Sequence, residues 1–366
     1  MDLAARHLGG SVVAASDESF GAKESLLRPE PVTFVPGTYD HKGEVVDGWE
    51  TRRRGPGSDW AVVRLGLPGI VRSLDVDTTS FSGNAPASCR VEACAMPGHP
   101  APEDLTGWEV LVPETALLPD AHNVLTVADP RRWTHVRLSV YPDGGVGRLR
   151  VEGEPVADPR LLDGLTVDLA SQELGAVVVA CTDDFYSPAE ALLRPDRPRT
   201  MGEGWEARRR RGPGHDAVVV RLGLAGIPQL VELDTTCFVH NASTSCSLWA
   251  ASCPDDPGAD DPRWVPLLPL TALRPDTRHR FRIDGGVTTH VRLDAHPDGG
   301  LARLRVVGPV APAARELAAL RWLDALPEAH ALAEGVPPAV VAGRPFPTAD
   351  ALRRLDPHAA TQLLGS

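Results

Sequence analysis

The sequence predicts an all-β fold that is built twice and followed by a short helical tail. Glycine and proline contribute 34 and 35 of the 366 residues, which is too many for a helical bundle because both residues interrupt helices. Up to about residue 310, the apolar segments are short, rich in β-branched residues and bounded by turn residues, as is typical of strands. The first half of the chain also recurs in the second half, which indicates a duplicated domain.

The duplication extends over most of both halves and keeps its order. Segment 12–18 aligns with 178–184, and Thr134–Leu138 aligns with Thr289–Leu293. Further matched pairs are Gly48–Arg54 with Gly204–Arg210, Val63–Leu67 with Val220–Leu224, and Pro142–Gly145 with Pro297–Gly300. Copies of this length indicate a tandem pair of domains and not a solenoid of short repeats.

We expect four parts along the chain. The first repeat covers residues 1–155 and the second covers 172–310, and residues 156–171 link them. Residues 311–366 form an Ala/Leu-rich tail with helical spacing, which we expect to be an appendage and not a third core.

Strand patterns recur inside each repeat. In the first, Trp60–Leu65 is β-branched and bounded by glycine, and Val71–Asp77 alternates apolar and polar residues. Pro142–Gly145 has the composition of a turn between strands at 133–140 and 147–151. Two such sets of short strands favour β-sandwiches of the jelly-roll type.

Charge and composition exclude several classes of protein. With 37 basic and 49 acidic residues, the net charge is -12, which argues against a nucleic-acid binder with a basic surface. The sequence has no run of 18 apolar residues and its start lacks the pattern of a signal peptide, so we expect no membrane association. Six cysteines without a CxxC motif predict reduced thiols and a cytoplasmic location.

The densest polar cluster joins Trp49 and Glu50 to Arg52 and Arg53 in a loop region before a strand. A guanidinium can bind a substrate carboxylate through two hydrogen bonds, and a neighbouring glutamate can transfer protons. An Arg–Glu network that only fixes the loop explains the same residues equally well.

Two other groups of residues are weaker candidates. Asp77 shares a strand face with Asp75, and Asn84 follows in a turn, where capping of the turn is as good an explanation as ligand binding. His135 and Arg137 share another strand face, and a strand histidine more often has a structural role.

No cofactor can be assigned from the sequence. No His/Cys cluster has metal-ligand spacing, and the sequence contains neither a phosphate-binding glycine loop before a helix nor a G-x-S-x-G motif.

Taken in order, these segments resemble a known family. Val13–Asp17, Asp47–Arg53, Asp59–Trp60, Asp75–Thr78 and Gly83–Pro86 closely resemble segments of allantoicase, the allantoate amidinohydrolase of purine breakdown. The resemblance covers about residues 10 to 310. It implies two tandem jelly-roll-like β-sandwiches of the galactose-binding-domain type. It also implies hydrolysis of the small molecule allantoate to ureidoglycolate and urea, in a homo-oligomer.

Under this resemblance, our hypothesis for the site centres on the first repeat. The proposed catalytic residues are Glu50 and Asp77, and the proposed substrate-binding residues are Trp49, Arg52, Arg53, Asn84, His135 and Arg137. Their equivalents in the second repeat are Glu206, Arg208, Arg209, His215, Asp234 and Asn241. The second repeat departs from the pattern at Glu203, Ala207, Ala217 and His240, which disfavours an independent site there. A site shared between the repeats stays open.

Two other functions compete with the enzyme. A non-catalytic sandwich pair that binds a small ligand or carbohydrate predicts exposed loop aromatics, and Trp49 and Trp205 fit that prediction. An inactive paralogue fits the departures in the second repeat. An assay with allantoate separates the enzyme from both.

Overall fold

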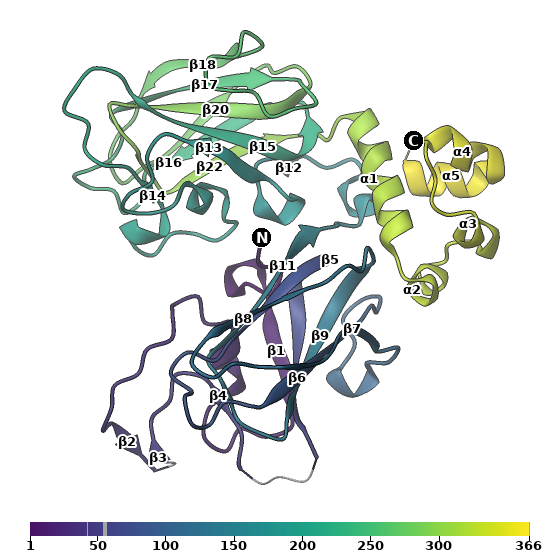
Figure 1. The fold of residues 1–366 in the computed structure, drawn as a ribbon. Helices are drawn as coiled ribbons and strands as arrows, with labels where there is room; N and C mark the ends of the chain where they lie inside the picture. The colour runs from purple at the N-terminus through teal and green to yellow at the C-terminus, as the bar shows by residue number, and fades with distance from the viewer. Residues whose placement is uncertain (42, 54–56, 366) are drawn as a thin grey trace. The chain divides into compact units, whose positions relative to one another are not determined.

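The computed structural model describes residues 1–41, 43–53 and 57–365. The chain divides into two compact units, one with residues 1–157 and 321–359, the other with residues 158–320 and the end of the chain from Ala360. Each unit contains one β-sandwich (Figure 1). Strands dominate both repeats, so the predicted all-β fold is confirmed.

The first repeat is built around one long strand, β5 (Asp59–Asp77). The strand order is β1–β5–β9–β6–β7, and β8 and β11 also pair with β5. The bounds are Ser11–Ala15 for β1, Ser88–Cys94 for β6, Glu109–Ala116 for β7, His122–Thr126 for β8, Arg132–Tyr141 for β9 and Arg148–Pro155 for β11. All pairings are antiparallel, and β5 bonds to β1 and β9 with its first half and mainly to β8 and β11 with its second half.

The prediction of two separate strands at 60–65 and 71–77 was wrong, because β5 runs through both. Gly66 and Gly69 lie between them and allow close backbone approach. A Cβ atom at Gly66 would lie 2.4 Å from the carbonyl oxygen of Leu8, and one at Gly69 would lie 2.2 Å from that of Glu154. The glycines therefore admit neighbouring chain segments and do not mark a turn.

The second repeat forms two distinct sheets. Their orders are β13–β15–β20–β17–β18 and β12–β22–β16–β19. The bounds are Val167–Asp168 for β12, Val177–Cys181 for β13, Asp216–Gly226 for β15, Leu230–Asp234 for β16, Ser245–Ala251 for β17, Val265–Ala272 for β18, Arg278–Arg282 for β19, Thr288–His296 for β20 and Arg303–Gly308 for β22. Each repeat buries its own apolar core, which contains Trp49 and Trp133 in the first and Trp205 in the second.

Short strand pairs hold the site region of each repeat. β4 (Trp49–Glu50) pairs with β10 (Gly145–Val146), and β14 (Trp205–Glu206) pairs with β21 (Gly300–Leu301). The predicted turn at Pro142–Gly145 thus delivers the strand that lies opposite Glu50. The first repeat adds the hairpin β2–β3 (Tyr39–Asp40 and Gly43–Glu44).

The tail is helical, as predicted. It contains α1 (Pro312–Ala325), α2 (Glu328–Ala333), α3 (Pro338–Ala342), α4 (Ala349–Leu355) and α5 (Pro357–Leu364), at the yellow end of the chain in Figure 1. The hydroxyl of Thr348 caps α4 by accepting the N–H of Ala351 at 3.3 Å. Over the described residues, none of the helices has the length and apolar character needed to cross a bilayer.

Candidate functional site

A cavity of about 450 Å³ lies in the first repeat, at the loop before β5. Four of the predicted site residues are in its lining: Glu50, Arg52, Arg53 and Asn84. The remaining lining residues are Phe20, Gly43, Glu44 and Val46. The cavity therefore combines two carboxyl groups (Glu50 buried and Glu44 exposed), two guanidinium groups and an amide with two apolar side chains.

Glu50 is the buried carboxyl group of this cavity. Its position in β4, paired with Gly145, leaves only 8% of the residue exposed. The Asn84 amide Nδ2 donates to Oε1 of Glu50 at 2.6 Å. Burial raises the pKa of the Glu50 carboxyl, and the Asn84 hydrogen bond and the Arg53 charge offset part of that rise. Glu50 therefore holds a proton to higher pH than an exposed glutamate.

Asp17 fixes the chain on the other side of Glu50. Its carbonyl oxygen accepts the indole N–H of Trp49 at 2.8 Å, and its Oδ1 accepts the backbone N–H of Arg52 at 2.8 Å. Trp49 is fully buried, so it anchors β4 and does not form a wall of the cavity. The Arg52 side chain, 65% exposed, lies with Nε 3.6 Å from Oδ2 of Asp17.

The second repeat reproduces this hydrogen-bond set. Asn241 Nδ2 donates to Glu206 Oε1 at 2.6 Å, and Trp205 Nε1 donates to the carbonyl oxygen of Asp183 at 2.9 Å. The backbone N–H of Arg208 donates to Asp183 Oδ1 at 2.9 Å. One contact differs: the Sδ of Met201 lies 2.8 Å from Nδ2 of Asn241, beside the carboxylate.

Besides Trp49, three residues predicted for the first-repeat site lie outside the cavity lining and have partners of their own. Asp77 is buried and its Oδ1 accepts the backbone N–H of Thr79 at 2.8 Å. Arg137 donates to Oε2 of Glu92 from Nε at 2.9 Å and from Nη2 at 2.7 Å, and it stacks on Trp108.

His135, the third of them, lies beside Thr134, with Nδ1 2.9 Å from Oγ1. Burial, with the charges of Arg64 and His99, lowers the pKa of His135 to about 4. Its imidazole is therefore neutral at neutral pH. Asp77, Arg137 and His135 make structural contacts, and our proposal for the site leaves them out.

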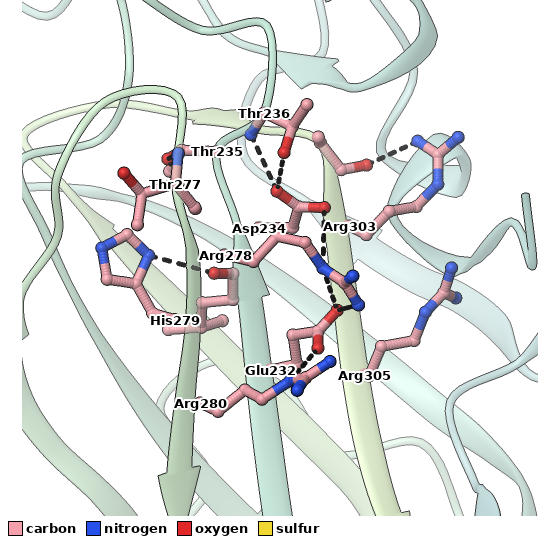
Figure 2. Close-up of polar contacts among 12 residues, drawn as sticks. Glu232, Asp234, Thr235, Thr236, Thr277, Arg278, His279, Arg280, Arg303 and Arg305 are labelled. Carbon is pink, nitrogen blue, oxygen red and sulfur yellow. Dashed lines mark hydrogen bonds and ion pairs between the residues drawn. The ribbon is translucent and has the colours of Figure 1, made fainter. Parts of the chain in front are cut away.

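The remaining second-repeat residues also have structural contacts or are exposed. His215 Nε2 lies 3.5 Å from Asp294 Oδ1, and Arg209 is exposed. Figure 2 shows Asp234 accepting the backbone N–H of Thr236, at 2.8 Å, next to Arg278. Asp234 thus repeats the contact that Asp77 makes in the first repeat.

Sequence reasoning did not identify Phe20, Glu44 and Val46, which complete the cavity. They lie in loops and in the β2–β3 hairpin, where no periodic pattern marks a wall. The alignment of Asp17 with Asp183 was the available signal for the anchoring aspartate. Arg54, the third arginine of the loop, lies outside the described residues. Within the described ranges, no three His, Cys, Asp or Glu side chains form a group that could hold a metal ion.

Comparisons with known proteins agree with this architecture. The family model "Allantoicase repeat" matches residues 1–156 and 167–311. A protein of Nocardia farcinica named probable allantoicase is 47% identical over 314 residues, which cover 84% of this chain and 93% of the relative. One of Streptomyces coelicolor with the same name is 44% identical over 324 residues, covering 84% and 85%. The crystal structure of allantoicase from Saccharomyces cerevisiae superposes with a TM-score of 0.72 at 29% identity, covering 84% of this chain and 92% of the yeast chain. This chain belongs to the allantoicase family.

Proposed function

We propose that this protein hydrolyses allantoate to ureidoglycolate and urea in allantoin degradation, and that the reaction takes place in the cavity of the first repeat. Membership of the allantoicase family supports the reaction. The buried Glu50 carboxyl beside Arg53 is the observation that supports the location. A buried carboxyl group with a raised pKa, next to a cation in a cavity, is a typical arrangement for acid–base chemistry.

The arginines bind the substrate carboxylate in this proposal. Allantoate carries one carboxylate and two ureido groups on a single carbon, so the site must fix an anion close to a proton donor. Arg53 supplies a positive charge that acts on the Glu50 carboxyl, and Arg52 adds a second guanidinium. Guanidinium groups pair with carboxylates through two parallel hydrogen bonds, which also fixes the orientation of the substrate.

Glu50 acts as the acid in the first step. Its proton passes to the ureido nitrogen that leaves, and the C–N bond to the central carbon breaks to release urea. The lone pair of the second ureido nitrogen stabilises the cation at that carbon. Water then adds to the carbon and returns a proton to Glu50, which gives ureidoglycolate. Asn84 holds the Glu50 carboxyl group in place.

The experiment that tests this function is an assay of urea release from allantoate by the purified full chain, with allantoin as the control substrate. We expect urea from allantoate only. A folded protein that binds allantoate without releasing urea would support a binding module or an inactive paralogue and would refute the enzyme.

A second measurement tests the role of the arginines. Arg53→Ala should raise KM about 10- to 100-fold, because a hydrogen bond to a charged group contributes about 1.5–3 kcal/mol. Arg209→Ala removes the aligned arginine of the second repeat and is the matched control. Equal effects of the two substitutions would contradict a site in the first repeat.

We also propose a cytoplasmic location and assembly into a homo-oligomer. All six cysteines are free thiols, as is usual in a reducing compartment. The steps described above use only side chains of this chain, and we propose no cofactor for them.

A further inference from the structure

The second repeat contains a Cys–His–Asp arrangement that the proposed hydrolysis does not use. The Sγ of Cys253 lies 3.6 Å from Nδ1 of His290, and Nε2 of the same imidazole lies 3.0 Å from Oδ1 of Asp256. His290 is on β20, and the other two residues are in the loop that follows β17. A thiol, an imidazole and a carboxylate are thus aligned in the order that activates a cysteine.

The carboxylate determines which imidazole nitrogen carries the proton. An ionised carboxylate can only accept a hydrogen bond, so Nε2 of His290 carries the hydrogen that it donates to Asp256. Arg221 holds the same carboxylate, with Nη1 3.2 Å from Oδ1. Nδ1 of His290 is then the basic nitrogen, and it faces Cys253 and the hydroxyl of Thr289 at 2.8 Å.

The hydroxyl of Thr289 has two possible acceptors besides Nδ1. Its oxygen lies 3.1 Å from the carbonyl oxygen of Ala251 and 3.0 Å from that of Cys253, and it accepts the N–H of Cys253 at 3.0 Å. When the Thr289 hydroxyl donates to either carbonyl, the S–H of Cys253 is the donor that remains for Nδ1.

This thiol is buried, and a cavity lies beside the segment that precedes it. Cys253 keeps 7% of its surface exposed, whereas Cys246 in the sandwich core has none. A cavity of about 400 Å³ is lined by Ala251 and Ser252, which directly precede the cysteine, and by Thr288. The surrounding apolar cluster, which includes Trp264, restricts the site to small molecules.

We propose that Cys253 is a nucleophilic thiol that reacts with small hydroperoxides, with His290 as the base and Asp256 as a positioning residue. The S–H proton passes to Nδ1 of His290, and Sγ attacks the terminal peroxide oxygen. The O–O bond breaks, the sulfur is oxidised to sulfenic acid, and the peroxide is reduced to water or an alcohol that takes the proton from His290. This site is independent of the reaction assigned to the first repeat.

The first repeat offers a matched reference for the arrangement. The N–H of Met96 donates to Thr134 Oγ1 at 3.1 Å, as the N–H of Cys253 donates to Thr289, and Thr134 also contacts the neighbouring His135. Met96 therefore occupies the position of Cys253. The substitution Met96→Cys places a thiol near His135, whose printed contacts within the described residues are Thr134 and the charges of Arg64 and His99.

The test is the rate of sulfenic acid formation with hydrogen peroxide, trapped with dimedone and measured peptide by peptide in the folded full chain. We expect Cys253 to react about tenfold faster than the more exposed Cys237, because His290 is placed to accept the proton of its thiol. His290→Gln should reduce the Cys253 rate to that of Cys237 and leave the Cys237 rate unchanged. Met96→Cys should react more slowly than Cys253.

Two outcomes would overturn the proposal. One is a Cys253 rate no higher than that of Cys237 in the wild-type chain. The other is a Cys253 rate that His290→Gln leaves unchanged. If His290→Gln does not fold, Asp256→Asn replaces it, since the Asp256 side chain is 44% exposed and its loss should not unfold the sandwich. An unchanged rate in that variant would also overturn the proposal.

Discussion

The two repeats share a hydrogen-bond set and differ in one loop. In both, an asparagine amide donates to a glutamate at 2.6 Å, and an aspartate holds the tryptophan and arginine on either side of that glutamate. Gly48 follows Pro29 by 19 positions, whereas Gly204 follows Pro195 by 9, so the loop of the first repeat is longer by ten residues.

The longer loop changes the surroundings of the shared glutamate. It carries the β2–β3 hairpin and supplies Gly43, Glu44 and Val46 to the cavity beside Glu50. In the second repeat, the shorter connection places Met201 against Asn241 next to Glu206. The shared hydrogen bonds therefore describe a scaffold, to which the longer loop of the first repeat adds cavity-lining residues.

The largest expected effect on activity distinguishes Glu50 from the aligned Glu206. Glu50→Gln keeps an acceptor for Asn84 and removes the proton donor, so kcat should fall about 10²- to 10⁴-fold. Glu206→Gln, which changes the aligned residue, should leave kcat within about twofold of wild type. Both are measured as urea release from allantoate by protein with an unchanged melting temperature. Comparable losses of kcat in Glu50→Gln and Glu206→Gln would contradict a catalytic role restricted to the glutamate of the first repeat.

The duplication allowed Glu50 and Glu206, and likewise Asn84 and Asn241, to be predicted as equivalent residues. Each pair occupies the same place beside a turn in the two aligned repeats. Strand alternation also predicted that His135 and Arg137 share a face. It could not predict their partners, since Glu92 on β6 is 45 residues away from Arg137 and meets it only through sheet pairing. Residues that line a cavity from a loop, such as Phe20 and Val46, follow no period and could not be found in this way.

The second expected effect tests the loop itself. Deletion of residues 37–46 removes the hairpin and shortens the loop by the ten residues that distinguish the repeats. Asp47 stays. In the intact chain its Oδ2 accepts the N–H of Thr33 at 3.0 Å and pairs with Arg148 at 2.7 Å, and we expect the variant to keep both contacts. We expect kcat/KM to fall roughly 10²-fold through loss of substrate positioning.

Tyr39→Ala is the control for this deletion, because Tyr39 is 70% exposed and does not line the cavity. Its kcat/KM should match the wild type. If the deletion variant kept wild-type activity, the loop would not be what distinguishes the first repeat, and the location of the site would have to be revised.

The third effect is a shift in pH dependence. Burial raises the pKa of Glu50, and activity that needs its protonated form is complete below that pKa and is lost as the pH rises through it. The Asn84 hydrogen bond lowers this pKa, so Asn84→Ala should raise it further and move the alkaline limb of kcat to higher pH. Asn241→Ala should not move that limb. If Glu50 acted as a base, the same rise in its pKa would instead move the acidic limb of kcat to higher pH.

The smallest effect concerns a position at which the repeats should behave alike. Asp77 and Asp234 each accept, at 2.8 Å, the backbone N–H of the residue two positions later. An asparagine side chain also offers an oxygen acceptor, so Asp77→Asn and Asp234→Asn should each lower the free energy of unfolding by less than about 1 kcal/mol. Guanidinium titration measures this change, and urea release gives the activity.

Activity distinguishes a cap from a catalytic carboxylate at this position. If Asp77 only caps the chain after β5, Asp77→Asn leaves kcat/KM within about twofold of wild type, because the acceptor is kept. If Asp77 transferred a proton, the same substitution would remove that capacity and kcat would fall as steeply as in Glu50→Gln. A steep loss in Asp77→Asn alone would extend the functional difference between the repeats to a contact that is geometrically equal in both. If Asp77→Asn and Asp234→Asn both kept wild-type activity, the functional difference between the repeats would be restricted to Glu50 and the loop beside it.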